Sequence, residues 1–371
     1  MKKIKIIISG GGTGGHIYPA ISIGNALKNK IKDVEILFVG AQGKMEMEKV
    51  PAAGYPIIGL PIRGFQRKLS IENLKFFFRL LASLRKARRI VKDFRPHAVV
   101  GVGGYASGPL LQSASKLGVP ALIQEQNSYP GVTNKLLARK VEKICVAYPN
   151  MERFFPKEKI IFTGNPVRQD LLDVDQKRAE GITHFGLQNG KKTLLILGGS
   201  LGARTINQSV LSKLQTVKDS DVQIIWQTGK FYYNEAMDRL KDWDIPNLKV
   251  FDFLSRMDLA YGVADLVISR AGAGTISELC LVGKPSVLVP SPNVSEDHQT
   301  KNAMALVHQQ AALMVRDKDA VEILMDQSLN WISEEPKLAL LSQNIKTLAM
   351  PEAAQHIAQE IIKMIEHHDN K

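Results

Sequence analysis

A cluster of glycines followed by a histidine is the first feature of this chain that could do chemistry. The segment from Ser9 to His16 reads SGGGTGGH, and Gly10, Gly12 and Gly15 fit the pattern G-x-G-x-x-G. Such a segment turns a strand tightly into a helix and exposes backbone N–H groups beside the positive end of that helix, where phosphate groups bind. An imidazole titrates near working pH, so His16 is a candidate general base.

The same glycine pattern occurs in proteins that bind NAD(P) or FAD. Those proteins also carry an Asp or Glu at the end of the second strand, which holds a ribose. The second predicted strand here, residues 35–39, runs into Gly40-Ala41-Gln42 without an acid. We therefore expect no dinucleotide cofactor. A purely structural turn is the alternative, although such a turn hardly requires five glycines and a histidine.

Four further loops of small or polar residues follow predicted strands. They are GGYASGP at 103–109, QEQN at 124–127, GGSLGAR at 198–204 and RAGAGTISE at 270–278. The last one leads into a helix, whose start suits a diphosphate. Glu278 suits ribose hydroxyls because a carboxylate accepts two hydrogen bonds, although alone it would be an ordinary favourable acid in a first helical turn. Five such loops in two halves of the chain predict a cleft that recognises phosphate and sugar on both walls.

The elements that must position these loops alternate between strand and helix. Short, mostly continuous apolar runs predict strands at residues 4–9, 34–39, 98–102, 119–123, 143–147, 160–163, 193–197, 222–227, 248–251, 265–269 and 286–289. Continuous apolar strands are typical of parallel sheets that are covered on both faces. The order predicts an α/β fold, built twice, with ligands outside the carboxyl ends of the strands.

The length and one turn divide the chain. A chain of 371 residues fits roughly two domains of ~150–200 residues. Gly164-Asn165-Pro166 is a turn that precedes a largely polar stretch, so we expect one domain over residues 1–166 and a second over residues 167–349. The last segment, residues 350–371, has a helical apolar pattern and is expected to pack back on the first domain.

Composition removes several classes of protein. Apolar residues make up 44% and charged residues 23% of the chain, which is typical of a soluble globular protein and not of a disordered chain or a coiled-coil rod. Cys145 and Cys280 lie far apart without a CxxC, which excludes a disulfide scaffold and favours a reducing, cytosolic compartment. Lys5 interrupts the first apolar stretch, so we expect neither a signal peptide nor a membrane-spanning helix.

Charge is distributed unevenly. The chain carries 49 Lys and Arg against 36 Asp and Glu, a net charge of +13. Residues 1–166 have a net charge of +17, and the remaining residues one of −4. The basic half therefore calls for an acidic partner or surface. Nucleic acid is one such partner, but the chain has no recognisable DNA- or RNA-binding motif and only 6% aromatic residues, so we expect no nucleic acid.

One segment of the basic half suits a membrane surface. Residues 71–95 predict a helix with Ser70 as its N-cap, and its apolar residues span an arc of about 220°, wider than the roughly 100° that a core-facing helix needs. Eleven basic and two acidic residues lie from Arg63 to Arg95. An apolar surplus with a cationic border suits the interface of an anionic bilayer. An ordinary core helix with a solvated basic back is the alternative.

Six blocks in a fixed order resemble one known family. They are GGGTGGH at 10–16, GGYASGP at 103–109, QEQN at 124–127, GNPVR at 164–168, GGSLGA at 198–203 and SRAGAGTISE at 269–278, and the similarity extends to residues 297–303. The family is MurG, whose members transfer N-acetylglucosamine from its UDP carrier to lipid I and so form lipid II, in the last cytoplasmic step of peptidoglycan precursor synthesis. The resemblance implies a GT-B fold, in which two Rossmann-like, doubly wound parallel-sheet domains face a cleft.

The resemblance also implies roles for individual residues. The amino-terminal half would bind the lipid acceptor and the carboxyl-terminal half the UDP-N-acetylglucosamine donor. His16 and Glu125 are the candidate catalytic bases, and a water that relays the proton is a third possibility. The implied donor-binding positions are Thr13, Gly14, Gly15, Asn127, Arg168, Ser200, Leu254, Ala273, Gly274, Thr275, Ile276, Ser277, Glu278 and Gln299.

An inverting displacement follows from the implied substrates, because this family has an α-linked donor and a β-linked product. Such a step needs a base for the acceptor hydroxyl and stabilisation of the leaving diphosphate, which N–H groups and helix ends supply without a metal. Three Asp-x-Asp sequences, at 173–175, 242–244 and 317–319, lie in polar stretches and are interpreted as solvated charge. We therefore expect neither a metal nor a cofactor.

The implied acceptor is lipid-linked, which favours the membrane interpretation of residues 71–95. We expect a peripheral enzyme on the anionic cytoplasmic face of the cell membrane, with contacts from Phe76, Phe77, Leu80, Lys75 and Arg79. Two other enzymes are alternatives: a UDP-sugar epimerase on the same fold, which would act on a soluble substrate, and a synthase that transfers sugar from a UDP-sugar to a membrane glycolipid.

Overall fold

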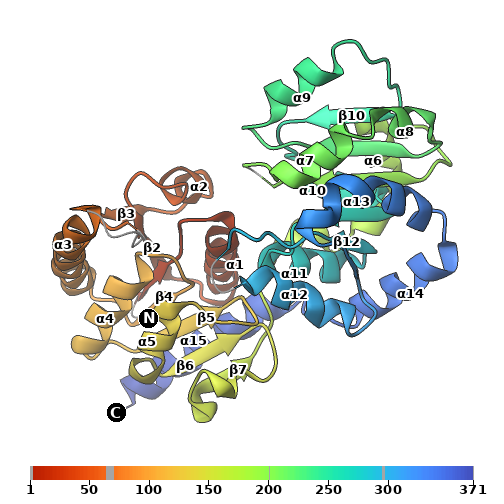
Figure 1. Cartoon of the computed structure of the whole chain (residues 1–371). Helices are drawn as coiled ribbons and strands as arrows, with labels where there is room; N and C mark the ends of the chain where they lie inside the picture. Colours follow the sequence, from red (N-terminus) through yellow and green to blue (C-terminus); the bar gives the residue numbers. More distant parts are fainter. Residues whose placement is uncertain (1–2, 64–70, 200, 295–296, 371) are drawn as a thin grey trace. The chain divides into compact units, whose positions relative to one another are not determined.

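A computed structural model describes residues 3–63, 71–199, 201–294 and 297–370. The chain divides into two compact units: unit 1 comprises Met1–Arg168 with Met350–Lys371, and unit 2 comprises Gln169–Ala349. Each unit contains one sheet in which every pair of neighbouring strands is parallel, with helices packed around it (Figure 1). The predicted α/β fold, with two doubly wound parallel sheets, is confirmed.

The sheet of unit 1 has seven strands in the order β3-β2-β1-β4-β5-β6-β7. Their bounds are β1 Ile4–Ser9, β2 Val34–Ala41, β3 Ile57–Leu60, β4 Ala98–Gly101, β5 Ala121–Glu125, β6 Lys143–Val146 and β7 Ile160–Phe162. The order reverses between β1 and β4, which are neighbours in the sheet, so their carboxyl ends form a topological switch point. Ligands bind at such points in open α/β sheets.

Alternate residues of these strands enter two different cores. Ile7 faces a core that includes Ala87 and Ile90, whereas Ile6 and Ile8 face a core that includes Ile357. The helices that cover the sheet are α1 Gly14–Lys30, α2 Glu46–Ala52, α3 Ile71–Phe94, α4 Ser107–Lys116, α5 Val132–Leu137 and α15 Ala353–Asp369. Both faces are therefore apolar, which is why the strands read as continuous apolar runs. The chain returns to unit 1 at its end, where α15 covers the same face as α1 (Figure 1).

Unit 2 repeats this arrangement with six strands in the order β10-β9-β8-β11-β12-β13. Their bounds are β8 Thr193–Leu197, β9 Gln223–Gln227, β10 Leu248–Phe251, β11 Leu266–Ser269, β12 Ser286–Leu288 and β13 Leu313–Met314. The helices are α6 Arg178–Phe185, α7 Arg204–Leu211, α8 Leu214–Asp219, α9 Tyr233–Leu240, α10 Met257–Val263, α11 Ala273–Val282, α12 His298–Val307, α13 Asp317–Trp331 and α14 Glu335–Lys346. The switch point lies between β8 and β11.

All the predicted strands are present, each within two residues of its predicted bounds. The strands β3 and β13 were not predicted, and both are edge strands. β13 has two residues, and β3 has four residues between Pro56 and Pro61. An edge strand needs only one neighbour and little apolar sequence, so its pattern is faint.

Candidate active site

The carboxyl ends of β1 and β4 bring two glycine loops into contact at the switch point of unit 1. Gly104 has a φ of +86°, and a Cβ on it would lie 2.3 Å from the carbonyl oxygen of Gly11. Gly103 has a φ of +100°, and a Cβ on it would lie 2.6 Å from Nδ1 of His16. Both positions combine a left-handed backbone with a close approach, so only glycine fits. The imidazole of His16 therefore packs directly on the second loop.

His16 lies in the first turn of α1, is partly exposed, and is held by the loop after β5. Its Nδ1 is 3.0 Å from Oε1 of Gln126. Gln126 is buried, and its Nε2 donates to the carbonyl oxygen of Val102 at 2.6 Å and to the side-chain oxygen of Gln124. The predicted site did not include Gln126, which has no chemistry of its own to mark it in the sequence.

Glu125 is the last residue of β5 and is 2% exposed. Oε1 accepts hydrogen bonds from the backbone N–H of Asn127 at 3.0 Å and from its Nδ2 at 3.2 Å. Oε2 accepts from the backbone N–H of Gly131 at 3.1 Å and from Nδ2 of Asn134 at 2.8 Å. The carboxylate thus organises residues 127–134, and four donors already use its lone pairs. The carboxylate is thus engaged by the protein itself and not directed at a substrate.

The other predicted residues of unit 1 lie at loop and helix ends. Thr13 is the exposed N-cap residue of α1, and its carbonyl oxygen accepts from the backbone N–H of His16 at 3.1 Å. Gly14 and Gly15 form the start of the same helix, so they share the switch point with His16. Asn127 is partly exposed and follows Gln126 directly, whereas Arg168 is partly exposed at the end of this part of unit 1.

A buried carboxylate that was not predicted holds the first glycine loop. Glu46, the first residue of α2, is 0% exposed and accepts hydrogen bonds from the backbone N–H groups of Gly12 and Ala41, both at 2.9 Å. A Cβ on Gly11 would lie 2.1 Å from Oε1 of Glu46, so the loop wraps closely around the carboxylate. The N–H of Gly12 therefore bonds to the protein itself. This use of an acid just beyond the second strand differs from the ribose contact of dinucleotide-binding proteins.

In unit 2 the glycine loop after β8 is held by backbone groups. The N–H of Gly198 donates to the carbonyl oxygen of Gln227 at 2.9 Å. A Cβ on Gly229, where φ is +80°, would lie 2.2 Å from the backbone nitrogen of Gly202. The loops after β8 and β9 therefore pack backbone against backbone, which glycine alone permits. Ser200, a predicted donor-binding residue, lies outside the described residues.

The second loop of this switch point leads into α11, whose N-cap residue is Gly272. Gly274 faces space in which no described atom lies within 4 Å of the place of a Cβ, so its backbone is accessible. Thr275 and Ser277 are partly exposed. Three predicted positions behave differently, because their side chains are buried in unit 2: Leu254, Ala273 and Ile276. A ligand at these positions would meet the backbone.

Two of the predicted polar side chains of unit 2, one on α11 and one on α12, are held in place by neighbours. Glu278 is partly exposed, and its Oε2 accepts a hydrogen bond from the hydroxyl of the buried Tyr261 at 3.2 Å. Gln299 lies in the first turn of α12, and its Oε1 accepts from the backbone N–H of Ser291 at 2.9 Å. Tyr261 was not predicted, since an isolated tyrosine in an apolar helix carries no signal in the sequence.

An ion pair stabilises the loop between β11 and α11. Arg270 follows β11, pairs with Asp317 at the start of α13, and donates to the carbonyl oxygen of Val289 at 3.1 Å. Asn302 is fully buried and donates to the carbonyl oxygen of Ala271 at 3.4 Å. The interpretation of Asp317 as solvated charge is therefore wrong, because only 20% of its side chain is exposed and it neutralises Arg270.

The described part of the chain contains no group of three or more His, Cys, Asp or Glu side chains suited to a metal ion. Asp173, Asp175, Asp242 and Asp244 are exposed, as predicted. The two cysteines are free and buried, and burial raises the pKa of each thiol to about 12. Neither buried thiol is therefore suited to act as a nucleophile at neutral pH.

The helix α3 exposes two aromatic rings. Phe77 and Phe78 are 57% and 65% exposed, and their rings meet edge to face with centroids 6.4 Å apart. Of the predicted contact residues, Leu80 packs against the core of unit 1, whereas Phe78, which was not among them, is exposed. Phe76 and Arg79 are partly exposed.

The helical period explains why Leu80 is packed against the core while Phe77 and Phe78 are exposed. The buried Ala87 and Ile90 lie on the same face of α3 as Leu80. Ser70 and the side chain of Lys75 lie outside the described residues. In the part of the chain that the structure describes, no helix is both long and apolar enough to cross a bilayer.

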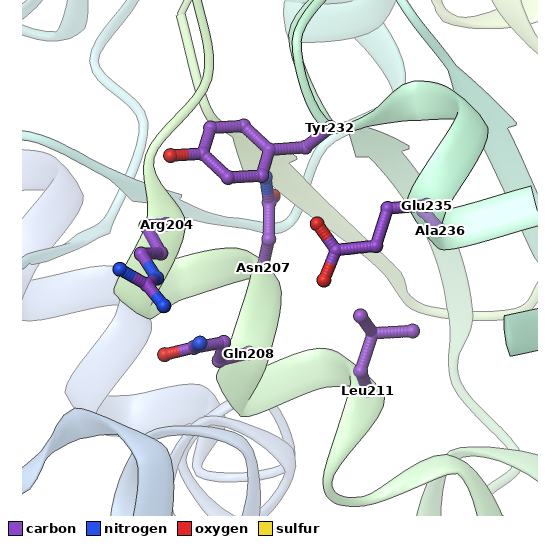
Figure 2. A pocket seen from close by; sticks show the side chains of 7 residues that line it. All are labelled: Arg204, Asn207, Gln208, Leu211, Tyr232, Glu235 and Ala236. Carbon is purple, nitrogen blue, oxygen red and sulfur yellow. The ribbon is translucent and has the colours of Figure 1, made fainter.

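A hollow of about 260 Å³ lies between α7 and α9 of unit 2. Figure 2 shows Arg204 and Glu235 extending beside it from the two helices, with Tyr232 at one end. Its remaining lining residues are Asn207, Gln208, Leu211 and Ala236. None of these was predicted as a site residue, and Asn207 is already bonded to Trp226 and to the carbonyl oxygen of Thr228.

Comparison with known proteins identifies the family. A model of the glycosyltransferase family 28 N-terminal domain matches residues 6–146, and one of the glycosyltransferase family 28 C-terminal domain matches residues 193–357. The UDP-N-acetylglucosamine–N-acetylmuramyl-(pentapeptide) pyrophosphoryl-undecaprenol N-acetylglucosamine transferase of Parabacteroides distasonis is 59% identical, over 99% of this chain and 100% of its own length. The enzyme of the same name from Bacteroides thetaiotaomicron is 58% identical, over 98% of this chain and 99% of its own.

A solved structure agrees with these relatives. The crystal structure of Acinetobacter baumannii MurG matches with a TM-score of 0.76 and 28% identity, over 98% of this chain and 100% of that one. The GT-B fold implied by the sequence blocks is thereby confirmed. The chain belongs to glycosyltransferase family 28 and, within it, to the MurG family of N-acetylglucosamine transferases.

Proposed function

We propose that this chain is an inverting glycosyltransferase that moves N-acetylglucosamine from UDP-N-acetylglucosamine to the muramyl 4-hydroxyl of undecaprenyl-pyrophosphoryl-N-acetylmuramyl-pentapeptide. The observation that carries the proposal is identity of 58–59% along nearly the whole length of relatives whose names specify this donor and this acceptor. An epimerase or a different glycolipid synthase would have to differ in substrate from relatives that are 58–59% identical over nearly their whole length.

His16 is the proposed general base. It takes the proton of the acceptor hydroxyl, the hydroxyl oxygen bonds to the anomeric carbon, and the bond from that carbon to the UDP oxygen breaks with inversion. His16 is partly exposed in the first turn of α1, whereas Glu125 is buried and bonded to four donors. This contrast favours His16 over Glu125, which we assign to holding the loop that carries Asn127.

The proposed donor site uses helix ends and backbone groups. The start of α11, with the accessible Gly274, would hold the diphosphate, and Arg168 would add positive charge to the leaving group. Glu278, oriented by Tyr261, would accept the ribose hydroxyls. The remaining proposed contacts are Thr13, Gly14, Gly15, Asn127, Ser200, Leu254, Ala273, Thr275, Ile276, Ser277 and Gln299.

The experiment that tests the function supplies purified protein with UDP-N-acetylglucosamine and a lipid I analogue in the presence of EDTA. We expect release of UDP that requires the acceptor, together with a product one N-acetylglucosamine heavier than the acceptor. Conversion of the UDP-sugar without an acceptor, with UDP-N-acetylmannosamine as the product, would instead indicate an epimerase. Transfer to diacylglycerol and not to the lipid I analogue would indicate the glycolipid synthase.

We also propose that α3 places the enzyme on the anionic inner face of the cytoplasmic membrane. Unit 1 carries a net charge of +16 and unit 2 one of −3, so the cationic surplus lies in the unit that exposes Phe77 and Phe78. Aromatic rings inserted at the headgroup level, with basic residues around them, are typical of peripheral membrane binding.

A double variant tests this surface. Phe77→Ser with Phe78→Ser should reduce co-sedimentation with vesicles that contain anionic lipid, because it removes the exposed apolar rings without opening the core. The matched control is Phe162→Ser with Phe231→Ser, which changes two other exposed rings, 51% and 75% exposed. Equal sedimentation of the α3 variant and the control would contradict the proposal, as would binding that is independent of anionic lipid.

A further inference from the structure

We propose that Gln126 is a positioning residue that holds His16 with its proton on Nδ1, which leaves the lone pair on Nε2. The inference deepens the proposed function, since it rests on His16 as the base. The observation behind it is a chain of buried amides that runs between two backbone carbonyl groups and ends at the imidazole.

The first part of the chain begins at Asn165, which is 4% exposed. Its Nδ2 donates to the backbone carbonyl oxygen of Gln126 at 3.0 Å. A carbonyl oxygen can only accept, so the amide of Asn165 has one orientation, with Oδ1 toward Gln124. Nε2 of Gln124 donates to that Oδ1 at 3.0 Å. The side-chain oxygen of Gln124 is thereby directed at Gln126.

The second part determines how the side chain of Gln126 lies. Its Nε2 faces three acceptors: the backbone carbonyl oxygen of Val102 at 2.6 Å, the side-chain oxygen of Gln124, and the backbone carbonyl oxygen of Gln124 at 3.4 Å. Turning the amide over would place its oxygen against these three oxygens with no proton between them, in a region where Gln126 is 2% and Gln124 0% exposed. An unpaired buried polar group costs about 1–3 kcal/mol, so the observed orientation is strongly preferred. Oε1 of Gln126 therefore faces His16.

The acceptor at the end of this chain determines the tautomer of His16. Nδ1 lies 3.0 Å from an oxygen that can only accept, so Nδ1 must carry the proton. In the neutral imidazole Nε2 then holds the lone pair, which is the form that a general base requires. The close packing of Gly103 against the ring, where a Cβ would lie 2.6 Å from Nδ1, hinders rotation of the imidazole away from Gln126.

The bond from Nδ1 to Gln126 is retained during the reaction. When Nε2 takes the acceptor proton, the imidazolium keeps its Nδ1–H donor, so no side chain of the network has to turn. The partner is a neutral amide, which orients the ring without adding a negative charge that would favour the imidazolium before substrate arrives. The neighbouring segments also carry the titratable residues Tyr18, Glu46, Tyr105 and Glu125, and the variants below leave all four in place.

The direct test measures the tautomer and does not depend on activity. Protein labelled with ¹⁵N at histidine is examined by NMR above the titration range of imidazole, and His16→Asn identifies the signals of His16 among the 8 histidines. In the wild type we expect a proton on Nδ1 and none on Nε2, and in Gln126→Met a mixture of the two tautomers. A wild-type proton on Nε2, or the same tautomer in both proteins, would overturn the inference.

Kinetics provide the second test. Gln126→Met should lower kcat by ~10-fold or more, because the ring loses its tautomer and orientation, while KM for UDP-N-acetylglucosamine stays within about two-fold. Gln223→Met is the matched control: Gln223 is a buried glutamine of unit 2 that bonds the backbone of Gln188 through both side-chain atoms. It should lower stability similarly and leave kcat unchanged. Equal kcat in wild type and Gln126→Met would overturn the inference.

Gln126→Glu separates tautomer from charge. A carboxylate still accepts from Nδ1–H, so the tautomer should be retained, but its charge stabilises the imidazolium and should move the acidic limb of the kcat/KM profile up by about one pH unit. If Gln126→Glu folds and the acidic limb of its kcat/KM profile is unchanged, the result would count against contact between the side chains of residue 126 and His16. The wild-type NMR result stands whether or not this variant folds. If His16→Ala turned over normally, the proposed base would fail while the tautomer measurement held.

Discussion

The glycine loops after β1 and β8 occupy equivalent places in two sheets whose strand orders agree over six strands, yet different groups hold them. The loop after β1 is bonded to the buried carboxylate of Glu46, and its neighbour His16 is bonded to the buried amide of Gln126. The loop after β8 is bonded to a backbone carbonyl group, and Gly202 packs against the backbone of Gly229.

The difference corresponds to the tasks that we propose for the two units. A side chain that moves a proton has to be held at one angle and in one protonation state, which takes a shell of buried polar side chains. A diphosphate is bound by N–H groups and helix ends, for which a closely approaching backbone is sufficient. Changes in the polar shell of unit 1 should therefore act on turnover, and changes in unit 2 on binding or stability.

The largest effect is expected at His16. His16→Ala should lower kcat by ~10²-fold or more, because the acceptor hydroxyl loses its base, and should leave the affinity for UDP nearly intact. Steady-state kinetics with the lipid I analogue and a calorimetric titration with UDP measure the two quantities. Unchanged turnover would show that His16 is not the base. A loss of UDP affinity would contradict the assignment of turnover to unit 1 and of UDP binding to unit 2.

Glu46→Gln tests the buried carboxylate in unit 1. The amide keeps one acceptor but turns a donor toward either Gly12 or Ala41, so we expect a loss of about 2 kcal/mol in unfolding free energy and a lower kcat. Urea denaturation and kinetics measure both. Glu235→Gln, at an exposed glutamate of α9, is the control and should change neither. Equal stability of the two variants would argue against a carboxylate that holds the loop.

Gly229→Ala is the counterpart in unit 2. The new Cβ would lie 2.2 Å from the nitrogen of Gly202 at a φ of +80°, so we expect a loss of about 1.5 kcal/mol through strain. Gly190→Ala serves as reference, because Gly190 has a similar φ of +85° with no described atom near its Cβ position, and about 1 kcal/mol is expected there from the backbone alone. Indistinguishable losses would mean that the close approach contributes nothing.

Glu278→Gln should act on binding. We expect KM for UDP-N-acetylglucosamine to rise ~10-fold, because a neutral amide is a weaker acceptor for two hydroxyls, while kcat changes by no more than a few-fold. The amide oxygen can still accept from Tyr261, so the protein should fold normally. A fall in kcat at constant KM would place Glu278 with the chemistry and contradict the division of tasks.

The smallest effect concerns acid stability. Hydrogen bonds from Arg256, joined by Lys177, hold the pKa of Asp258 well below its usual range. A lowered pKa contributes stability above the unfolded-state value of about 3.9, and that contribution is lost as the pH falls toward the lower folded-state value. Asp258→Asn should thus be less stable than wild type at pH 7, and the gap should narrow below about pH 4. Urea denaturation at several pH values measures the difference in unfolding free energy between wild type and Asp258→Asn. A difference that stays constant from pH 7 to pH 3 would contradict this prediction.

The strands and loops could be predicted because each leaves a local pattern. Continuous apolar runs marked the strands, and glycines after them marked the loops at both switch points. The pattern was insufficient where burial is slight. The strands β3 and β13 are short edge strands, and the apolar arc of α3 did not separate Leu80, which packs against the core, from Phe78, which is exposed.

The side chains that hold the site could not be predicted in the same way. Glu46 is 34 residues from Gly12 and Gln126 is 110 residues from His16, so neither pair shares a local pattern. An acid at the start of a helix and an amide in a distant loop have no periodicity that would reveal their partners. Asp317, interpreted as solvated, is paired with Arg270 for the same reason, since its partner lies 47 residues away.

The sequence by itself determined the α/β class, the position of the strands, the family and the loops in which the chemistry is expected, because periodicity, glycine and short motifs act over a few residues. Only the tertiary structure decided which groups meet: Glu46 with the first glycine loop, Gln126 with His16, and four donors with Glu125. Those contacts follow from parallel strands that bring distant loops to one edge of a sheet. There burial makes every unpaired polar atom costly and so selects a single arrangement.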